Sequence, residues 1–335
     1  MGKVATYLTF LRIPGLGGLA IPPVIAALTV GVTDLFSLIL LFLVGSFSII
    51  FGFILNDYVD VEVDRLSKDL QTRPLVSGAI PSQNVVWICF TCVILTFVCL
   101  GFLFYGKVMT DYRIAAVLVI ALAYLLGSIY DYHGKKIVAS DIIIALAIAL
   151  VFLTGALAVS MPLTIFTWIV FILTFNNLLH MNAVEGGIKD ADHDYKKEVK
   201  NLAYRMGVRV RGNVLQIPLP FKIFSMSIRV FSVLLLFVPF FIFHQPFYLW
   251  QLIILGLACC GVLIFSLRLL FLTTFDRKKI RKFISIQSFL RYSLVPLMLL
   301  SIIGFTISII LIVLPIVWYL IFTPFTGDKF LQPRM

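Results

Sequence analysis

The chain contains 335 residues, of which 61% are hydrophobic and only 13% are charged, and its net charge is +11. Because soluble globular domains carry about 25% charged residues, this composition excludes an ordinary water-soluble fold and favours a protein embedded in a lipid bilayer. The basic residues form no stripe interleaved with aromatic side chains, so the positive charge does not indicate a nucleic acid partner.

Ten apolar runs follow one another along the sequence, most of them near the roughly 20 residues that a membrane-spanning helix needs. The runs cover residues 13–30, 35–55, 85–105, 114–129, 142–159, 163–179, 224–243, 249–272, 283–303 and 305–322. The last two meet at Gly304 and could be divided differently, which leaves nine spans as an alternative to ten. Continuous apolar runs exclude a membrane β-barrel, whose strands alternate in polarity. We therefore predict an all-α fold, a polytopic transmembrane helical bundle of nine core spans with an additional tenth.

The connections between these runs differ in charge. Basic residues gather in alternate connections, which cover residues 65–73, 135–136, 189–211 and 277–282. The opposite connections hold mainly Lys107 and Arg113. Cytoplasmic connections of membrane proteins carry an excess of Lys and Arg, so we expect the first set, and any site among them, to face the cytoplasm.

The second run ends in a group of acidic residues. If its helix continues, Asp57, Asp60 and Asp64 share one face because they are spaced by three and four residues, and Asn56 lies beside that face. Stacked carboxylates repel one another, so a bound cation would explain their position at the end of an apolar helix. Hard oxygen ligands favour Mg²⁺, with Ca²⁺ as the second choice. The alternative is a solvated helix end that carries ordinary surface acids.

A second acidic group follows the sixth run. Asp190 and Asp194 are one helical turn apart, which predicts a second metal-binding face. Asp192 points elsewhere on such a helix and is expected to face solvent. His193 is expected to be solvated or to support the metal ligands rather than to bind the metal. Because Mg²⁺ commonly completes its coordination with substrate phosphate, the two groups indicate a Mg²⁺–diphosphate site.

Basic residues near both groups could hold phosphate oxygens. The candidates are Arg65, Lys68, Arg73, Lys136 and Lys200. For each of them the alternative is an ordinary positive charge of a cytoplasmic connection.

Two motifs resemble those of the UbiA superfamily of intramembrane prenyltransferases. Residues 56–64 have the form N-D-x-x-D-x-x-x-D and are followed by R-P-L-V-S-G at residues 73–78. The second motif is the D-x-x-x-D of residues 190–194, with a basic residue at Lys200 and a glycine at Gly207. Other features similar to the family are Arg12 with Pro14, and Tyr130 followed by Lys135 and Lys136. The resemblance covers about residues 8–300, and residues 305–323 would form an extra C-terminal span of a single domain over residues 1–335.

The resemblance implies nine spans around a central cavity that opens to the cytoplasmic side. It implies that Mg²⁺ and a diphosphate are bound by Asn56, Asp57, Asp60, Asp64, Asp190 and Asp194, with Tyr130 and the basic candidates beside them. The implied reaction transfers a prenyl group from a polyprenyl diphosphate, through Mg²⁺-assisted ionisation of the diphosphate, to an aromatic quinone precursor or a glyceryl phosphate lipid. Glu198 and Asn201 stand where the family often has Gly and Ser or Thr, which leaves the acceptor open.

Other functions fit parts of the pattern. The same ionisation could lead to terpene cyclisation or to transfer of another group onto a lipid phosphate. A secondary transporter would use the acidic residues as an ion pathway, but such residues tend to lie near the bilayer midplane at broken helices. Both acidic groups here end apolar runs, which favours a metal–phosphate site over a transport pathway.

Overall fold

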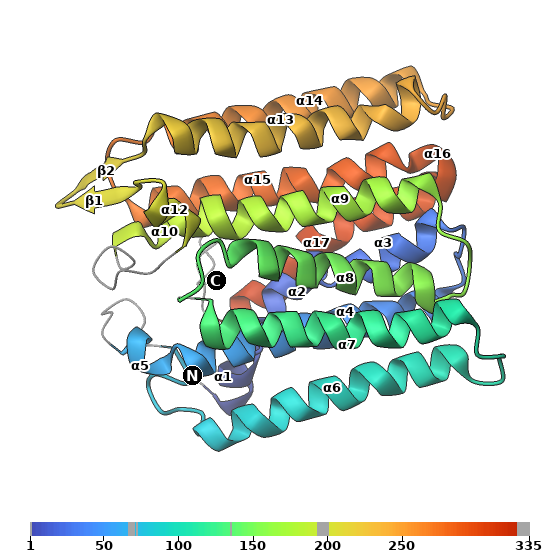
Figure 1. The fold of residues 1–335 in the computed structure, drawn as a ribbon, viewed down its shortest axis with the longest axis horizontal. Coiled ribbons are helices and arrows are strands. Elements are labelled where there is room, and N and C mark those ends of the chain that lie inside the picture. Colours follow the sequence, from blue (N-terminus) through green and yellow to red (C-terminus); the bar gives the residue numbers. More distant parts are fainter. Residues whose placement is uncertain (1, 66–70, 72, 135, 193–200, 327–335) are drawn as a thin grey trace.

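The computed structural model describes residues 2–65, 71, 73–134, 136–192 and 201–326. Its long helices lie side by side along one axis and form a bundle (Figure 1). The long helices are α4 (Leu35–Val59), α6 (Ser82–Phe104), α7 (Asp111–His133), α8 (Asp141–Ala158), α9 (Ile165–Leu179), α13 (Leu219–Phe241), α14 (Leu249–Leu270), α15 (Arg277–Met298) and α17 (Phe305–Thr326). The short elements are α1 (Lys3–Phe10), α2 (Ile13–Leu19), α3 (Pro22–Thr29), α5 (Val61–Asp64), the π-helix η2 (His180–Gly186), α10 (Gly187–Lys189), α12 (Leu202–Arg205), α16 (Leu300–Ile303) and the antiparallel pair β1 (Arg209–Arg211) and β2 (Val214–Gln216).

Within the described ranges, nine helices are long and apolar enough to cross a membrane, which confirms the predicted all-α transmembrane bundle. The first of these spans, Lys3–Thr29, joins α1, α2 and α3 and begins well before the predicted run 13–30. The predicted run 283–303 is also helical, as α15 and α16, but it is not among the nine. Five of the six residues 277–282, which open α15, are basic, so the helix as a whole has too much charge for an ordinary span.

Large apolar side chains cover the outside of the bundle. Examples are Trp87 on α6, Leu118 on α7 and Leu257 on α14, all of which are exposed. Soluble monomers rarely expose apolar patches larger than a few hundred Å². The exposed belt and the nine spans show a multi-pass integral membrane protein.

The last long helix, α17, packs against the N-terminal part of the chain. α17 packs against α2 and α15, and Trp318 Nε1 of α17 donates a hydrogen bond of 2.8 Å to the carbonyl oxygen of Ile13. The two ends of the described chain are therefore held together by direct contacts.

Two glycines allow close approach of backbones inside the bundle. A Cβ at Gly45 of α4 would lie 2.1 Å from the Ala20 carbonyl oxygen, and one at Gly155 of α8 would lie 2.0 Å from the Pro23 carbonyl oxygen. Small residues at such crossings let membrane helices pack backbone to backbone. These contacts position α2 and α3, which line the site described below.

We expect Gly45→Ala to destabilise the protein by about 1–3 kcal/mol, because the added methyl group must push the neighbouring backbone away. Gly52→Ala on the same helix is the matched control, since among the described residues a Cβ built there meets nothing within 4 Å apart from the adjoining residues of its own helix. The midpoint of thermal unfolding in detergent measures the difference. Equal midpoints for the two variants would contradict the close packing.

Candidate functional site

The first acidic group lies at one end of the bundle, where α4 passes into α5 (Figure 1). The Asp60 amide donates to the Asn56 carbonyl oxygen at 3.0 Å, and the Asp64 amide donates to the Asp60 carbonyl oxygen at 2.8 Å. The helical register therefore continues across the junction between the two helices. Asp57 and Asp64 are only 8% and 7% exposed, whereas Asp60 is half-buried, so two of the carboxylates need buried partners.

Arg73 supplies one such partner. Its Nη1 donates to Asp57 Oδ1 at 3.1 Å and to Asp64 Oδ2 at 2.7 Å. Burial alone would lower the pKa of Arg73, but the charges of Asp57, Asp64 and Asp190 outweigh burial and raise that pKa above its ordinary value. Arg73 is thus a permanent cation that joins the first acidic group and lies in the electrostatic range of the second.

Arg12 is a further cation of this group, and sequence reasoning gave it no role in the site. Its Nη2 donates to Asp57 Oδ1 at 2.6 Å, and its guanidinium lies 4.5 Å from the centroid of the Phe53 ring. Arg12 adopts a φ of 50°, which is uncommon for a residue other than glycine, directly before α2. A lone arginine beside an apolar run, with Pro14 soon after it, was the available signal.

The second acidic group approaches the first from the end of α10. Asp190 follows α10 directly, and Lys189 Nζ lies 3.5 Å from Asp190 Oδ2. Lys189 is also within electrostatic range of Arg12 and Arg73. The cations of the two acidic groups, which are far apart in sequence, therefore lie within electrostatic range of one another.

Other residues of the second group have different positions. Asp192, which we expected to face solvent, instead accepts a hydrogen bond of 2.6 Å from Arg277 at the start of α15. Asp194, Lys68 and Lys200 lie outside the described residues, as does His193.

A further acidic side chain reaches the first group from α7. Asn56 Nδ2 donates to Asp131 Oδ1 at 3.2 Å, and Asp131 is buried. The adjacent residue Tyr130, which the sequence predicted to lie beside the diphosphate, is half-buried. Asp131 escaped sequence reasoning because a single aspartate at the end of a span is also common as a solvated helix end.

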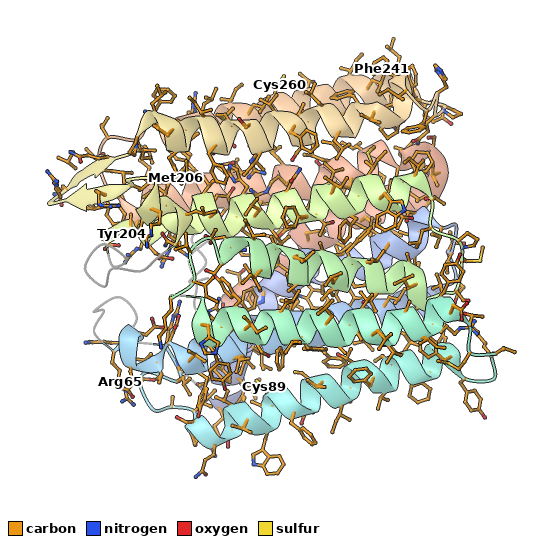
Figure 2. The ribbon with its side chains drawn as sticks, viewed as in Figure 1. Arg65, Cys89, Tyr204, Met206, Phe241 and Cys260 are labelled. Atoms are coloured by element: carbon orange, nitrogen blue, oxygen red, sulfur yellow. The ribbon has the colours of Figure 1, made fainter. Side chains whose placement is uncertain are left out.

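Two predicted diphosphate ligands are exposed rather than buried in this cluster. Arg65 is exposed at the end of the bundle, where it pairs with the exposed Glu62 at 2.7 Å (Figure 2). Lys136 is exposed as well. Of the described basic candidates, Arg73 alone contacts the predicted carboxylates.

The donor atoms of the first group suit a hard cation. Within the described ranges, no three His, Cys, Asp or Glu side chains are arranged to hold a metal ion by themselves. The group instead offers carboxylate oxygens that Arg12 and Arg73 partly neutralise. Mg²⁺ takes one or two carboxylates and completes its coordination with water and phosphate oxygens, so the residues present fit Mg²⁺ together with a phosphorylated substrate.

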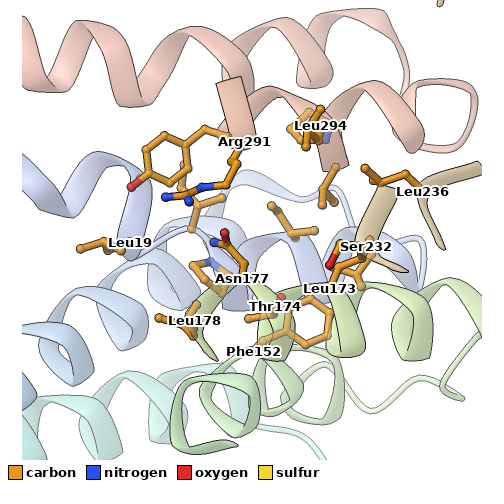
Figure 3. Close-up of a pocket in the computed structure, with 18 of the residues that line it drawn as sticks. Leu19, Phe152, Leu173, Thr174, Asn177, Leu178, Ser232, Leu236, Arg291 and Leu294 are labelled. Atoms are coloured by element: carbon orange, nitrogen blue, oxygen red, sulfur yellow. The ribbon is translucent and has the colours of Figure 1, made fainter. Parts of the chain in front are cut away.

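An apolar cavity lies inside the bundle. Its volume is about 130 Å³, and Leu19, Phe152, Leu173 and Leu236 are among its lining residues (Figure 3). α2 connects the two regions, because Arg12 precedes this helix and Leu19 ends it. α2 thus runs from the charged group to a residue that lines the apolar cavity.

Comparisons with known proteins agree with these features. The family model described as the UbiA prenyltransferase family matches residues 20–294. A 4-hydroxybenzoate octaprenyltransferase of Francisella tularensis subsp. mediasiatica is 24% identical over 159 residues, which are 48% of this chain and 52% of that protein. The chain thus matches only about half the length of this curated relative.

Solved structures of low sequence identity share the fold. A UbiA homologue from Archaeoglobus fulgidus bound to DMAPP and Mg²⁺ has a TM-score of 0.60 at 19% identity, covering 89% of this chain and 99% of that one. A digeranylgeranylglyceryl phosphate synthase has a TM-score of 0.57 at 22% identity, covering 90% and 98%. With the family match over most of its length and the two acidic motifs meeting at one end of the bundle, the chain belongs to the UbiA prenyltransferase family.

Proposed function

We propose that this protein transfers a prenyl group from a polyprenyl diphosphate to an aromatic quinone precursor or a glyceryl phosphate lipid, with Mg²⁺ as its cofactor. The observation that carries the proposal is the cluster in which Arg73 bridges Asp57 and Asp64 and lies in the field of Asp190. The names of the relatives support both the donor and the two acceptor classes.

The roles follow from the chemistry of the side chains. The Mg²⁺ ligands would come from the oxygen donors of both motifs, namely Asn56, Asp57, Asp60, Asp64, Asp190 and Asp194. Arg12, Arg73 and Lys189 would hold diphosphate oxygens, because guanidinium and ammonium groups form charge-assisted hydrogen bonds to phosphate. The other proposed diphosphate ligands are those predicted from the sequence, namely Arg65, Lys68, Tyr130, Lys136 and Lys200.

The reaction requires that the bond between C1 of the prenyl group and the diphosphate oxygen breaks. Bound Mg²⁺ would supply Lewis-acid stabilisation of the negative charge on the leaving diphosphate. Arg12 and Arg73 would stabilise the same charge from fixed positions. An allylic cation left behind needs an environment that excludes water, and the apolar cavity beyond α2 offers one.

We also propose that the site faces the cytoplasm. The end of the bundle that carries α5 and α10 also carries basic residues such as Arg65 and Lys189, and an excess of Lys and Arg marks the cytoplasmic side. The contacts of α17 with α2 support a single domain over residues 1–335, with a family-like core over about residues 8–300.

The purified protein in detergent, given a panel of prenyl diphosphates, tests this function. We expect diphosphate release that requires Mg²⁺, stops with EDTA and rises when one acceptor is added, with a prenylated product seen by mass spectrometry. 4-Hydroxybenzoate and an alkylglyceryl phosphate are the acceptors to add singly.

Two outcomes would change the assignment. Release at full rate without any acceptor would indicate a cyclase or a hydrolase. No release from any donor, in protein shown to be folded, would contradict the transferase and direct attention to transport.

A further inference from the structure

Three charged side chains from three different helices meet inside the bundle. Glu185 of η2 accepts from Arg229 Nη2 of α13 at 2.7 Å and from Arg291 Nη2 of α15 at 3.2 Å, and Arg291 Nη1 also donates to it. Glu185, Arg229 and Arg291 are 1%, 4% and 9% exposed. The π-helical turn, a feature often found at functional sites, carries Glu185 at this point.

The charges of this group do not balance. Among the described residues, Glu185 is the one carboxylate that pairs with Arg229 or Arg291, so two cations share one anion. His180 Nδ1 lies 3.4 Å from Glu185 and brings no negative charge. The Nε atoms of both arginines are buried and have no hydrogen-bond partner. A buried unpaired cation is costly, and a bound anion would remove that cost.

Both arginines line the apolar cavity. Figure 3 shows the Arg291 guanidinium extending towards the side of the cavity where Asn177 lies. The Oδ1 atom of Asn177 is also buried without a donor, so the polar side of the cavity offers two cations and a free acceptor. Leu173, Leu236 and the other aliphatic side chains form the rest of the wall.

We propose that this cavity binds the anionic end of an amphipathic molecule, a carboxylate or a phosphate on an apolar body, with Arg229 and Arg291 as its charge partners. A hydroxyl or protonated group on the same molecule would donate to Asn177. That this molecule is the prenyl acceptor rests on the function proposed above. The positions agree with such a role, because α2 leads from Arg12 at the diphosphate site to Leu19 at the cavity.

Binding measured without donor and without Mg²⁺ tests this site independently of the reaction. The probes are two matched pairs: 4-hydroxybenzoate with 4-hydroxybenzamide, and a long-chain alkylglyceryl phosphate with the uncharged alkylglycerol. We expect the anion of one pair to bind at least about tenfold more tightly than its neutral analogue, and the pair that shows the preference identifies the source of the anion.

Substitution of the arginines shows whether they cause the preference. Arg229→Gln and Arg291→Gln should each remove the preference for the anionic probe. Arg291→Lys should keep part of this preference. Each single variant leaves Glu185 with one arginine, which favours folding, and a thermal unfolding curve checks this. Arg113→Gln is the matched control, since Arg113 is buried in α7 but does not line the cavity.

Two results would overturn the site. One is equal binding of charged and neutral probes by the unchanged protein. The other is an anion preference that survives both Gln substitutions in folded protein. Because neither readout needs turnover, failure of prenyl transfer alone leaves this inference standing, and failure of anion binding leaves the transferase standing.

Discussion

Asp60→Asn and Asp190→Asn are each expected to abolish Mg²⁺-dependent diphosphate release, with a rate loss of at least about a hundredfold. Each substitution keeps the shape of the side chain but removes the charge that would hold the cation. Both residues are at least partly exposed at helix ends, so the variants should stay folded. The rate is measured with saturating prenyl diphosphate over a range of Mg²⁺ concentrations, and folding is measured by thermal unfolding.

Glu62→Gln provides the control for these variants. The Glu62 side chain is 75% exposed on α5, between Asp60 and Asp64 in sequence, and it pairs with Arg65 on the surface. Its substitution removes one negative charge from the same helix without touching the buried group, so near-normal release is expected. Retained activity in both Asp60→Asn and Asp190→Asn would contradict the assignment of the two motifs as the metal site.

Most of the fold could be predicted from the sequence because lipid restricts what a backbone can do. An apolar run such as residues 35–55 has to form a helix in lipid, and α4 follows that run closely. Prediction was weaker where a helix mixes apolar and basic residues. α15 opens with a basic stretch and continues through the bundle, and the first span begins at Lys3 although Arg12 interrupts it.

The candidate site could be predicted only in part, since local spacing reveals ligands on one helix but not their distant partners. The register of Asp57, Asp60 and Asp64 follows from helical geometry alone. The contacts of Arg12 with Asp57 and of Asn56 with Asp131 join residues 45 and 75 positions apart, which no local pattern specifies. The contacts of Glu185 depend on a π-helical turn, and the signal that could have found them is the presence of Arg229 and Arg291 within the apolar runs 224–243 and 283–303.

Glu185→Gln is expected to lower the free energy of unfolding by about 3–5 kcal/mol, because it leaves Arg229 and Arg291 buried together without a counter-charge. Gln keeps the size of the side chain, so packing contributes little to the loss. Denaturant or thermal unfolding in detergent measures the effect. Unchanged stability would contradict the buried charge group as the structure shows it.

The double variant Glu185→Gln with Arg229→Gln separates charge from packing. The double variant keeps one cation, Arg291, so the net charge of the group is +1, the same as in the unchanged protein. It should therefore recover part of the stability that Glu185→Gln loses.

The single variant Glu185→Gln should also be stabilised more by a bound anion than the unchanged protein is. A ligand stabilises the folded state by mass action, and the excess of positive charge beside the cavity is larger in this variant. If the anion that binds the cavity raises the unfolding midpoint of Glu185→Gln no more than that of the unchanged protein, the two arginines do not act as its charge partners.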